Sequence, residues 1–193
     1  MIVFDTLRRY LEYLGNKVLY VSNITDIDDK LIKKGQEDGT TMQEVARKFE
    51  AEYIKDSEGL NVKTPTVRPR ATEHIGEIIK IVKDLVESGH AYVAHNGDVY
   101  FRVKSDPGYG KLSHLNLDDL ESGNRELRSQ MDDDLKEDPA DFAVWKAAKP
   151  GEPSWNSPWG QGRPGWHIEC SAMARKHLGK TIDLHAGGQD LIF

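Results

Sequence analysis

A short stretch dense in proline, glycine and tryptophan divides this chain and limits the folds open to it. Over residues 150–166, eleven of 17 positions are Pro, Gly or Trp. Proline fixes its backbone torsion and lacks an amide hydrogen, so no long helix can run through the stretch. Glycine permits backbone conformations that other residues rarely adopt. The stretch therefore predicts an irregular loop of defined shape, the kind of segment that commonly carries a functional site.

Apolar spacing before this stretch predicts helices and a buried strand. A first helix ends at Gly15, and we expect one of its faces to pack inward, namely Leu7, Tyr10, Leu11 and Leu14. Residues 18–21 form a short apolar run, typical of a parallel strand, and with the helix make half of a βαβ unit. The further predicted helices are one capped by Thr or Asp and running toward Gly35, one opening with a Thr41–Glu44 capping box, and one from Thr72 to Gly89.

The pattern changes at residue 91. Two short apolar runs flank Asn96-Gly97, which predicts a β-hairpin with a type I′ turn. Order resumes with a strand at 142–145. We therefore expect three parts: residues 1–90, an insertion at 91–140, and residues 141–193, the first and last forming one α/β domain.

The residues after the Pro- and Gly-rich loop predict a helix and then a strand. Residues 170–178 fit a helix stopped by Gly179, and residues 182–184 fit the next strand. His185 and the glycines at 187 and 188 then follow the end of that strand. In open α/β sheets this edge is where ligands bind.

Composition excludes several classes of protein. A net charge of −6 and a pI near 5.7 argue against nonspecific nucleic-acid binding by the whole surface, so any RNA contact must be local. A single cysteine excludes an internal disulfide framework and suits a reducing compartment. No membrane span or export signal is evident, which favours a cytoplasmic protein. The oligomeric state is not revealed, and a monomer is the default expectation.

Both ends of the chain look cut. The first helix has no polar residue ahead of it as a cap, and the chain ends on an apolar run at residues 191–193. We therefore expect a piece of a longer polypeptide.

Three runs together resemble cysteinyl-tRNA synthetases, which are class I enzymes. They are Asn-Ile-Thr-Asp-Ile-Asp-Asp-Lys at 23–30, the run 159–173 with its Trp-His-Ile-Glu-Cys core, and Asp-Leu-His-Ala-Gly-Gly-Gln-Asp at 183–190, which continues to Phe193. The resemblance covers essentially the whole chain. It implies a Rossmann-type catalytic core interrupted by a connective-peptide insertion. It also implies Zn²⁺ and ATP with Mg²⁺ as cofactors, and cysteine and tRNA(Cys) as partners, with no membrane.

The resemblance also assigns roles to single residues. Cys170 matches a zinc-ligating cysteine, and soft zinc–thiolate bonding, at about 2.3 Å, can distinguish the thiol of cysteine from the hydroxyl of serine. The matched substrate-binding residues are Thr25, Trp166, His167 and His185. The matched nucleotide-binding residues are Gly187, Gly188 and Asp190. No protein nucleophile is implied, so Cys170 is not expected to act as one.

Several family motifs fall outside these 193 residues, including the other zinc ligands and both ATP signatures. We therefore expect the isolated chain neither to hold zinc tightly nor to form cysteinyl-adenylate. Two alternatives stay open at this point. One is the related ligase that joins cysteine to an amino sugar in thiol-cofactor synthesis, and the other is a non-catalytic interaction or RNA-binding module of the same fold.

Overall fold

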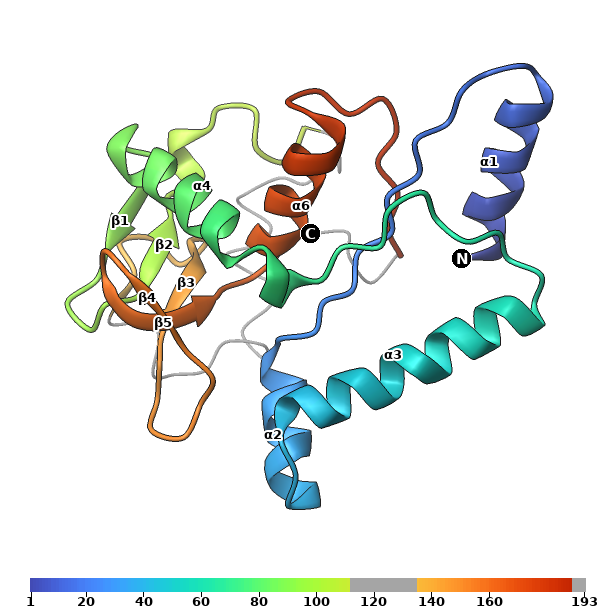
Figure 1. Cartoon of the computed structure of the whole chain (residues 1–193). Helices are drawn as coiled ribbons and strands as arrows, with labels where there is room; N and C mark the ends of the chain where they lie inside the picture. The colour runs from blue at the N-terminus through green and yellow to red at the C-terminus, as the bar shows by residue number, and fades with distance from the viewer. Residues whose placement is uncertain (112–134, 189–193) are drawn as a thin grey trace. The chain divides into compact units, whose positions relative to one another are not determined.

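The computed structural model describes residues 1–111 and 135–188 (Figure 1). The chain divides into two compact units. The first combines residues 1–77 with 169–186, and the second combines residues 78–168 with the chain from Gly187 onward. The predicted division at residues 90 and 140 stays a prediction. No helix in the described ranges is both long enough and apolar enough to cross a membrane.

The first unit is built mainly from helices, and its predicted helices are confirmed. They are α1 Ile2–Tyr13, α2 Asp29–Asp38, α3 Met42–Gly59, the start of α4 Ile75–Glu87, and α6 Ile168–Leu178 from Glu169 onward. Asp28 caps α2 by accepting a hydrogen bond from the amide of Leu31 at 2.6 Å. Thr41 and Glu44 form the predicted capping box at the start of α3, each side chain accepting from the other's amide.

Residues 18–21 do not form the predicted strand. Instead, residues 20–24 run parallel to residues 67–71 through two isolated bridges, Val21 with Val67 and Ile24 with Arg70. The amide of Ile24 donates to Pro69 O at 2.8 Å, and Ala71 donates back to Ile24 O at 3.1 Å. The prolines at 65 and 69 cannot donate to a ladder, which accounts for pairing in bridges rather than in a continuous strand.

An ion pair between half-exposed Arg70 and buried Glu50 holds the second of these segments to α3. Arg70 donates from Nε and Nη2 to the two carboxylate oxygens of Glu50, at 2.9 and 2.8 Å. Glu50 is buried, and such two-point pairs fix orientation as well as charge. The nearby 3-10 turn η1, Ala71–Glu73, is held by Asp26, which accepts from the amide and the hydroxyl of Thr72.

The inward face of α1 is polar, contrary to the prediction. Asp5 and Arg8 are buried, whereas Leu7, Tyr10 and Leu14 are exposed. Asp5 accepts from the amide of Lys63 at 3.1 Å, and Arg8 donates to Thr64 O at 2.7 Å. These bonds attach α1 to the backbone of the 61–66 loop, so the buried face of the helix is the one that makes tertiary hydrogen bonds and not the one with the apolar stripe.

The second unit contains a five-stranded sheet in the order β1-β2-β3-β5-β4. Its strands are β1 Ala91–Val93, β2 Val99–Phe101, β3 Phe142–Ala147, β4 Trp155–Ser157 and β5 Gly160–Pro164, with the turn η2 Val103–Ser105 after β2. All named pairings are antiparallel. The described strands therefore do not show the parallel sheet of the predicted Rossmann core. Fully buried side chains include Ile78, Val82, Val99 and Trp145.

Two features of this sheet differ from the predictions, the turn between β1 and β2 and the Pro- and Gly-rich stretch. β1 and β2 pair as expected, but only Gly97 of the Asn-Gly pair has a positive φ, at 91°. Gly97 N donates to Ala94 O at 3.0 Å, and Ala94 N to Asp98 O at 2.8 Å, a three-residue loop in place of the two-residue type I′ turn. The Pro- and Gly-rich stretch is not wholly irregular, because residues 155–164 form the β4–β5 hairpin.

Gly165 offers a test of how closely the chain passes over β3. A Cβ at this position would overlap with the carbonyl oxygen of Ala143, a backbone atom. We expect Gly165→Ala to lower the free energy of unfolding by at least about 2 kcal/mol, as measured by urea denaturation. Gly76→Ala is the matched control, because Gly76 is exposed on α4 and a Cβ there meets nothing within 4 Å. This change should stabilise the chain by about 0.5–1 kcal/mol. Equal effects would contradict this account.

Two side-chain contacts tie α6 to the segment after η1 within the first unit. His74 Nδ1 donates to Arg70 O at 2.7 Å, which leaves Nε2 as an acceptor for His177 Nε2–H at 3.1 Å. Beside them, Lys176 of α6 forms an ion pair with Glu77 of α4. Burial lowers the pKa of His177, the charges of His74 and Lys176 add to that effect, and Glu77 opposes it.

The His74–His177 bond predicts acid sensitivity. Because the folded pKa of His177 lies below its unfolded value, the unfolded chain binds more protons, and stability is lost as pH falls through the folded pKa. His177→Gln keeps a donor but cannot titrate. The free energy of unfolding of this variant, measured by urea denaturation, should fall less between pH 7.5 and pH 5 than that of the unchanged chain. His95→Gln, at an exposed position, should behave like the unchanged chain. Identical pH profiles for all three proteins would refute the prediction.

Candidate active site

The run from Trp166 to Cys170 leads into α6. Trp166 lies on the second unit, with its amide donating to Ala143 O at 2.8 Å and its ring edge-on to Phe142 at 5.9 Å between centroids. Its side chain is 46% exposed, so one face is open for contact. His167 has a φ of 57°, which non-glycine residues rarely adopt and which is found more often at functional sites.

A polar cluster in the first unit joins residues far apart in sequence. Asn23 Nδ2 donates to Cys170 Sγ at 3.5 Å and to Thr25 Oγ1 at 3.3 Å. Thr25 Oγ1 in turn lies 3.5 Å from Glu169 Oε1. The pairing of residues 20–24 with 67–71, and the contacts of α6 with His74 and Glu77, hold these two parts of the chain together.

Burial dominates the electrostatics of this cluster. Glu169 is 6% exposed, and its Oε2 atom has no hydrogen-bond partner among the described residues. Burial raises the pKa of Glu169, and its neighbours Thr25 and Cys170 only partly offset that shift. Burial, followed by the adjacent Glu169 charge, raises the pKa of the Cys170 thiol to about 12. A cation in the cluster would compensate both buried acids.

These side chains fit part of a metal site. Ligand atoms of His167, Glu169 and Cys170 lie within 4.8 Å of one another, the one such group of three found in the described ranges. They belong to one continuous stretch of five residues, so the local backbone sets their proximity. A thiolate with an imidazole or carboxylate suits zinc, and the residues therefore fit the implied metal.

The predicted nucleotide-binding residues do not form a site within the described residues. Residues 182–184 do not form the predicted strand, and no backbone hydrogen bond joins residues 180–188 to another described residue. A β-strand is defined by its hydrogen bonds to a neighbouring strand, and this segment makes none with the described residues. His185, Gly187 and Gly188 are exposed there, and Asp190 lies outside the described residues.

The sequence analysis missed two members of the cluster. Asn23 donates to the thiol, and the thiol donates to Glu169 Oε1 at 3.6 Å. Asn23 opens the run that contains Thr25, and Glu169 precedes Cys170, so their places in the motifs were the available signal. The sequence does not show that the run at 23–30 and the run at 159–173 contact each other.

Comparison with known proteins identifies the class. The family described as tRNA synthetases class I (C) catalytic domain matches residues 1–193, and the chain belongs to it. Among its relatives, a cysteine–tRNA ligase of Caldicellulosiruptor saccharolyticus is 57% identical over 193 residues, and one of Symbiobacterium thermophilum is 57% identical over 192. In both cases all of this chain aligns, and it spans 40% of the relative's length.

The pKa of Cys170 gives a direct test of the cluster. With a pKa of about 12, alkylation by iodoacetamide at pH 8 should be at least about tenfold slower than for free cysteine, and should still rise above pH 10. Glu169→Gln removes the adjacent charge and should shift the rate profile to lower pH. Glu58→Gln, at the exposed end of α3, should not. A rate plateau near pH 9 in the unchanged chain would show an ordinary thiol instead.

Proposed function

We propose that this chain is part of a cysteine–tRNA ligase, which activates cysteine with ATP and transfers it to tRNA(Cys). The observation that carries the proposal is the cluster in which Asn23 and Thr25 meet Glu169 and Cys170. It lies in a chain that aligns in full with two ligases of that name at 57% identity. Neither relative bears the name of an amino-sugar ligase or of a non-catalytic module, so the comparisons favour the leading hypothesis.

Under this proposal Cys170 is a zinc ligand. A bound zinc ion would supply a soft Lewis acid that selects a thiol over a hydroxyl. His167 and Glu169, whose ligand atoms lie within 4.8 Å of the Cys170 sulfur, would help to hold it. Thr25 and Trp166 would contact the cysteine substrate, with the exposed indole face of Trp166 offering an apolar wall.

The remaining assignments are carried by the resemblance alone. They place His185 beside the amino-acid substrate and Gly187, Gly188 and Asp190 beside the adenosine. A Rossmann-type core in the intact protein is part of the same proposal, as are Mg-ATP binding, a cytoplasmic location and a monomeric state.

Such a ligase joins the carboxylate oxygen of cysteine to the α-phosphorus of ATP as the bond to pyrophosphate breaks. The acyl group then passes to a ribose hydroxyl at the end of tRNA, and AMP leaves. Both transfers depend on alignment and on charge stabilisation, without a protein nucleophile. A protonated, largely buried Cys170 agrees with that, because a nucleophilic thiol needs a lowered pKa.

A segment replacement tests the proposal. Residues 1–193 would replace the matching 40% of the C. saccharolyticus ligase. We expect cysteine-dependent exchange of pyrophosphate into ATP within about tenfold of the unmodified enzyme, because the site residues are supplied in their native relation. A folded chimera without cysteine-dependent exchange would overturn the proposal.

Cys170→Ser in the same chimera separates the metal role from folding. Loss of the thiolate should lower both zinc content and exchange activity, the latter by at least about a hundredfold. Gln43→Ala, at an exposed position on α3, should leave both unchanged. Full zinc content in the serine variant would exclude Cys170 as a ligand.

A further inference from the structure

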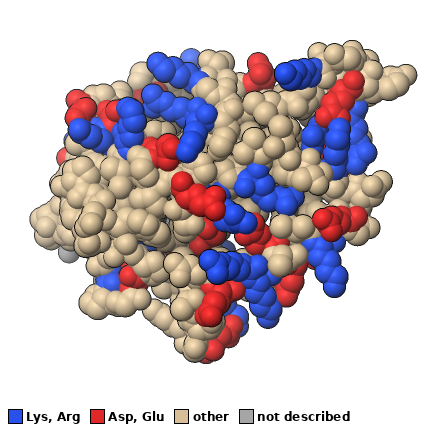
Figure 2. Space-filling model, in the orientation of Figure 1, with Lys and Arg blue, Asp and Glu red and all other residues tan. Residues whose placement is uncertain are grey.

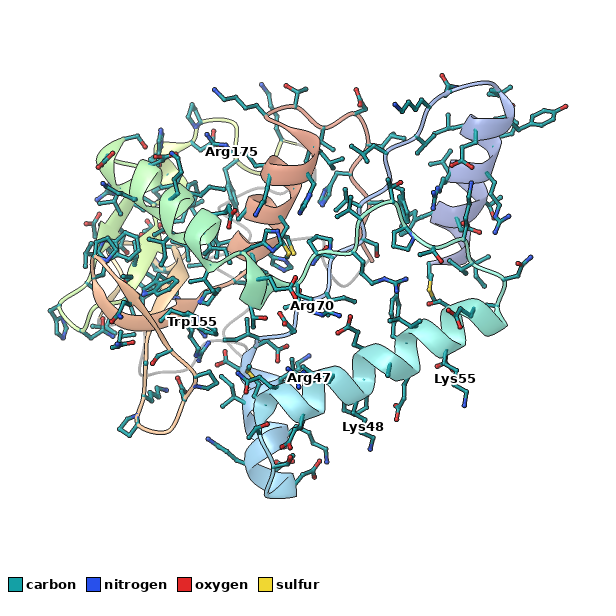
Figure 3. All side chains as sticks on the ribbon, in the orientation of Figure 1. Arg47, Lys48, Lys55, Arg70, Trp155 and Arg175 are labelled. Atoms are coloured by element: carbon teal, nitrogen blue, oxygen red, sulfur yellow. The ribbon has the colours of Figure 1, made fainter. Side chains whose placement is uncertain are left out.

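Two histidines from distant parts of the chain meet within the first unit. His74 follows η1, His177 lies in the last turn of α6, and their Nε2 atoms are 3.1 Å apart. Figure 3 marks the two elements, with Arg70 on the segment that enters η1 and Arg175 on α6. No binding or catalytic role proposed above uses this histidine pair.

The spacing of the two rings is close to that of two imidazoles on one metal ion. Two imidazole nitrogens bound at about 2.0–2.1 Å to a tetrahedral zinc ion lie about 3.3 Å apart, with ring centres about 5.2 Å apart. In the histidine pair the Nε2 atoms are 3.1 Å apart and the ring centroids 5.2 Å apart. The pair therefore needs only small side-chain rotations to hold an ion.

His74 is held in the way that a ligand histidine is held. Its Nδ1–H donates to the carbonyl oxygen of Arg70 at 2.7 Å, so Nε2 is the unprotonated nitrogen. In metal sites, a hydrogen bond of this kind fixes the tautomer and the orientation of the ring and makes the imidazole a stronger ligand. His74 is only 5% exposed, which leaves its ring little freedom to turn.

His177 can supply the second nitrogen. Its ring is half-buried, so the pair is reached from solvent on this side, and burial holds the pKa of His177 below its usual value. Its Nδ1 atom has no hydrogen-bond partner among the described residues. Moving the ring proton from Nε2 to Nδ1 gives a neutral imidazole whose Nε2 lone pair can bind a metal. Binding near neutral pH therefore requires no net loss of a proton.

One carboxylate and one ammonium group act on the pair. The charge of Glu77, in the first turn of α4, interacts with both histidines, and Glu77 is ion-paired with Lys176 of α6. The side chains of Lys176 and Glu77 are 42% and 37% exposed. Exposed pairs of this kind are worth little, so Lys176 can turn to water and leave the carboxylate beside the ion.

From these contacts we infer that His74 and His177 bind a divalent transition-metal ion, with the Glu77 carboxylate as counter-charge and water in the open positions. Imidazole suits zinc, copper and nickel, and the spacing of the rings fits zinc. This site is separate from the Cys170 cluster, because His177 lies about 10 Å further along α6. An ion here would fasten α6 to the chain that follows η1. The inference does not rest on the proposed function.

The test measures zinc binding to the 193-residue chain, without an affinity tag, by isothermal titration calorimetry at pH 7.5. Cys170→Ser serves as the background, because it removes the thiolate of the proposed zinc ligand. Surface carboxylates are competing ligands, and Figure 2 shows them interspersed with Lys and Arg. An excess of Mg²⁺ occupies such oxygen sites but not imidazoles. We expect saturable zinc binding that survives this excess.

Variants in the same background locate the ion. His177→Gln and His74→Gln should each weaken zinc binding at least about tenfold, because a single imidazole remains. His95→Gln, at an exposed position, and His167→Gln, beside Cys170, are the matched controls and should leave the affinity unchanged. Circular dichroism checks that each variant is folded, and His177→Gln alone decides the matter if His74→Gln is not. Zinc binding that Mg²⁺ abolishes would overturn the inference, as would unchanged affinity in folded His177→Gln or equal weakening by either control.

The imidazole tautomers provide a second readout that a change in stability would not imitate. In a nuclear magnetic resonance spectrum correlating ring nitrogens with ring protons, zinc should move the His177 proton from Nε2 to Nδ1. The Nε2 signals of His74 and His177 should shift, and those of His95 should not. An unchanged His177 tautomer at saturating zinc would contradict the proposed site. Neither readout involves pyrophosphate exchange, so failure here leaves the ligase proposal intact.

Discussion

The hydrogen bonds between residues 20–24 and 67–71 are the constraint on which the first unit depends. They are few, yet they place Asn23 and Thr25 on a backbone that is also fixed to α3 through Arg70 and Glu50. The His74–His177 bond and the Glu77–Lys176 ion pair then attach α6 to the same segment. Through these links, two stretches separated by more than 140 residues form one polar cluster.

That cluster combines burial with charge in an unusual way. A carboxyl group and a thiol lie side by side, largely shielded from water, and burial raises the pKa of both. Such an arrangement is costly unless a proton or a cation neutralises it. The burial that makes Cys170 a poor nucleophile is also what a cation in the cluster would offset, in line with the proposed zinc site.

The second unit has a different organisation, based on antiparallel pairing. Buried Asp141 accepts hydrogen bonds from Tyr92 and from the amide of Val103, which fixes the start of β3 against β1 and η2. The chain then returns along β5 and passes over Ala143 at Gly165, where no side chain fits. Trp166 is thereby held by backbone bonds on one side while its indole stays accessible.

The amino-acid sequence by itself determined the features that depend on neighbouring residues. These are the helices α2, α3, α4 and α6 with their caps, the β1–β2 pairing, and the motifs around Thr25 and Cys170, because capping and apolar spacing act within a few positions. Tertiary structure alone decided which face of α1 is buried, whether residues 18–21 and 182–184 become strands, and that Asn23 and Glu169 surround the thiol. Those outcomes depend on hydrogen bonds between parts of the chain that are distant in sequence. The local spacing of residues does not determine these bonds.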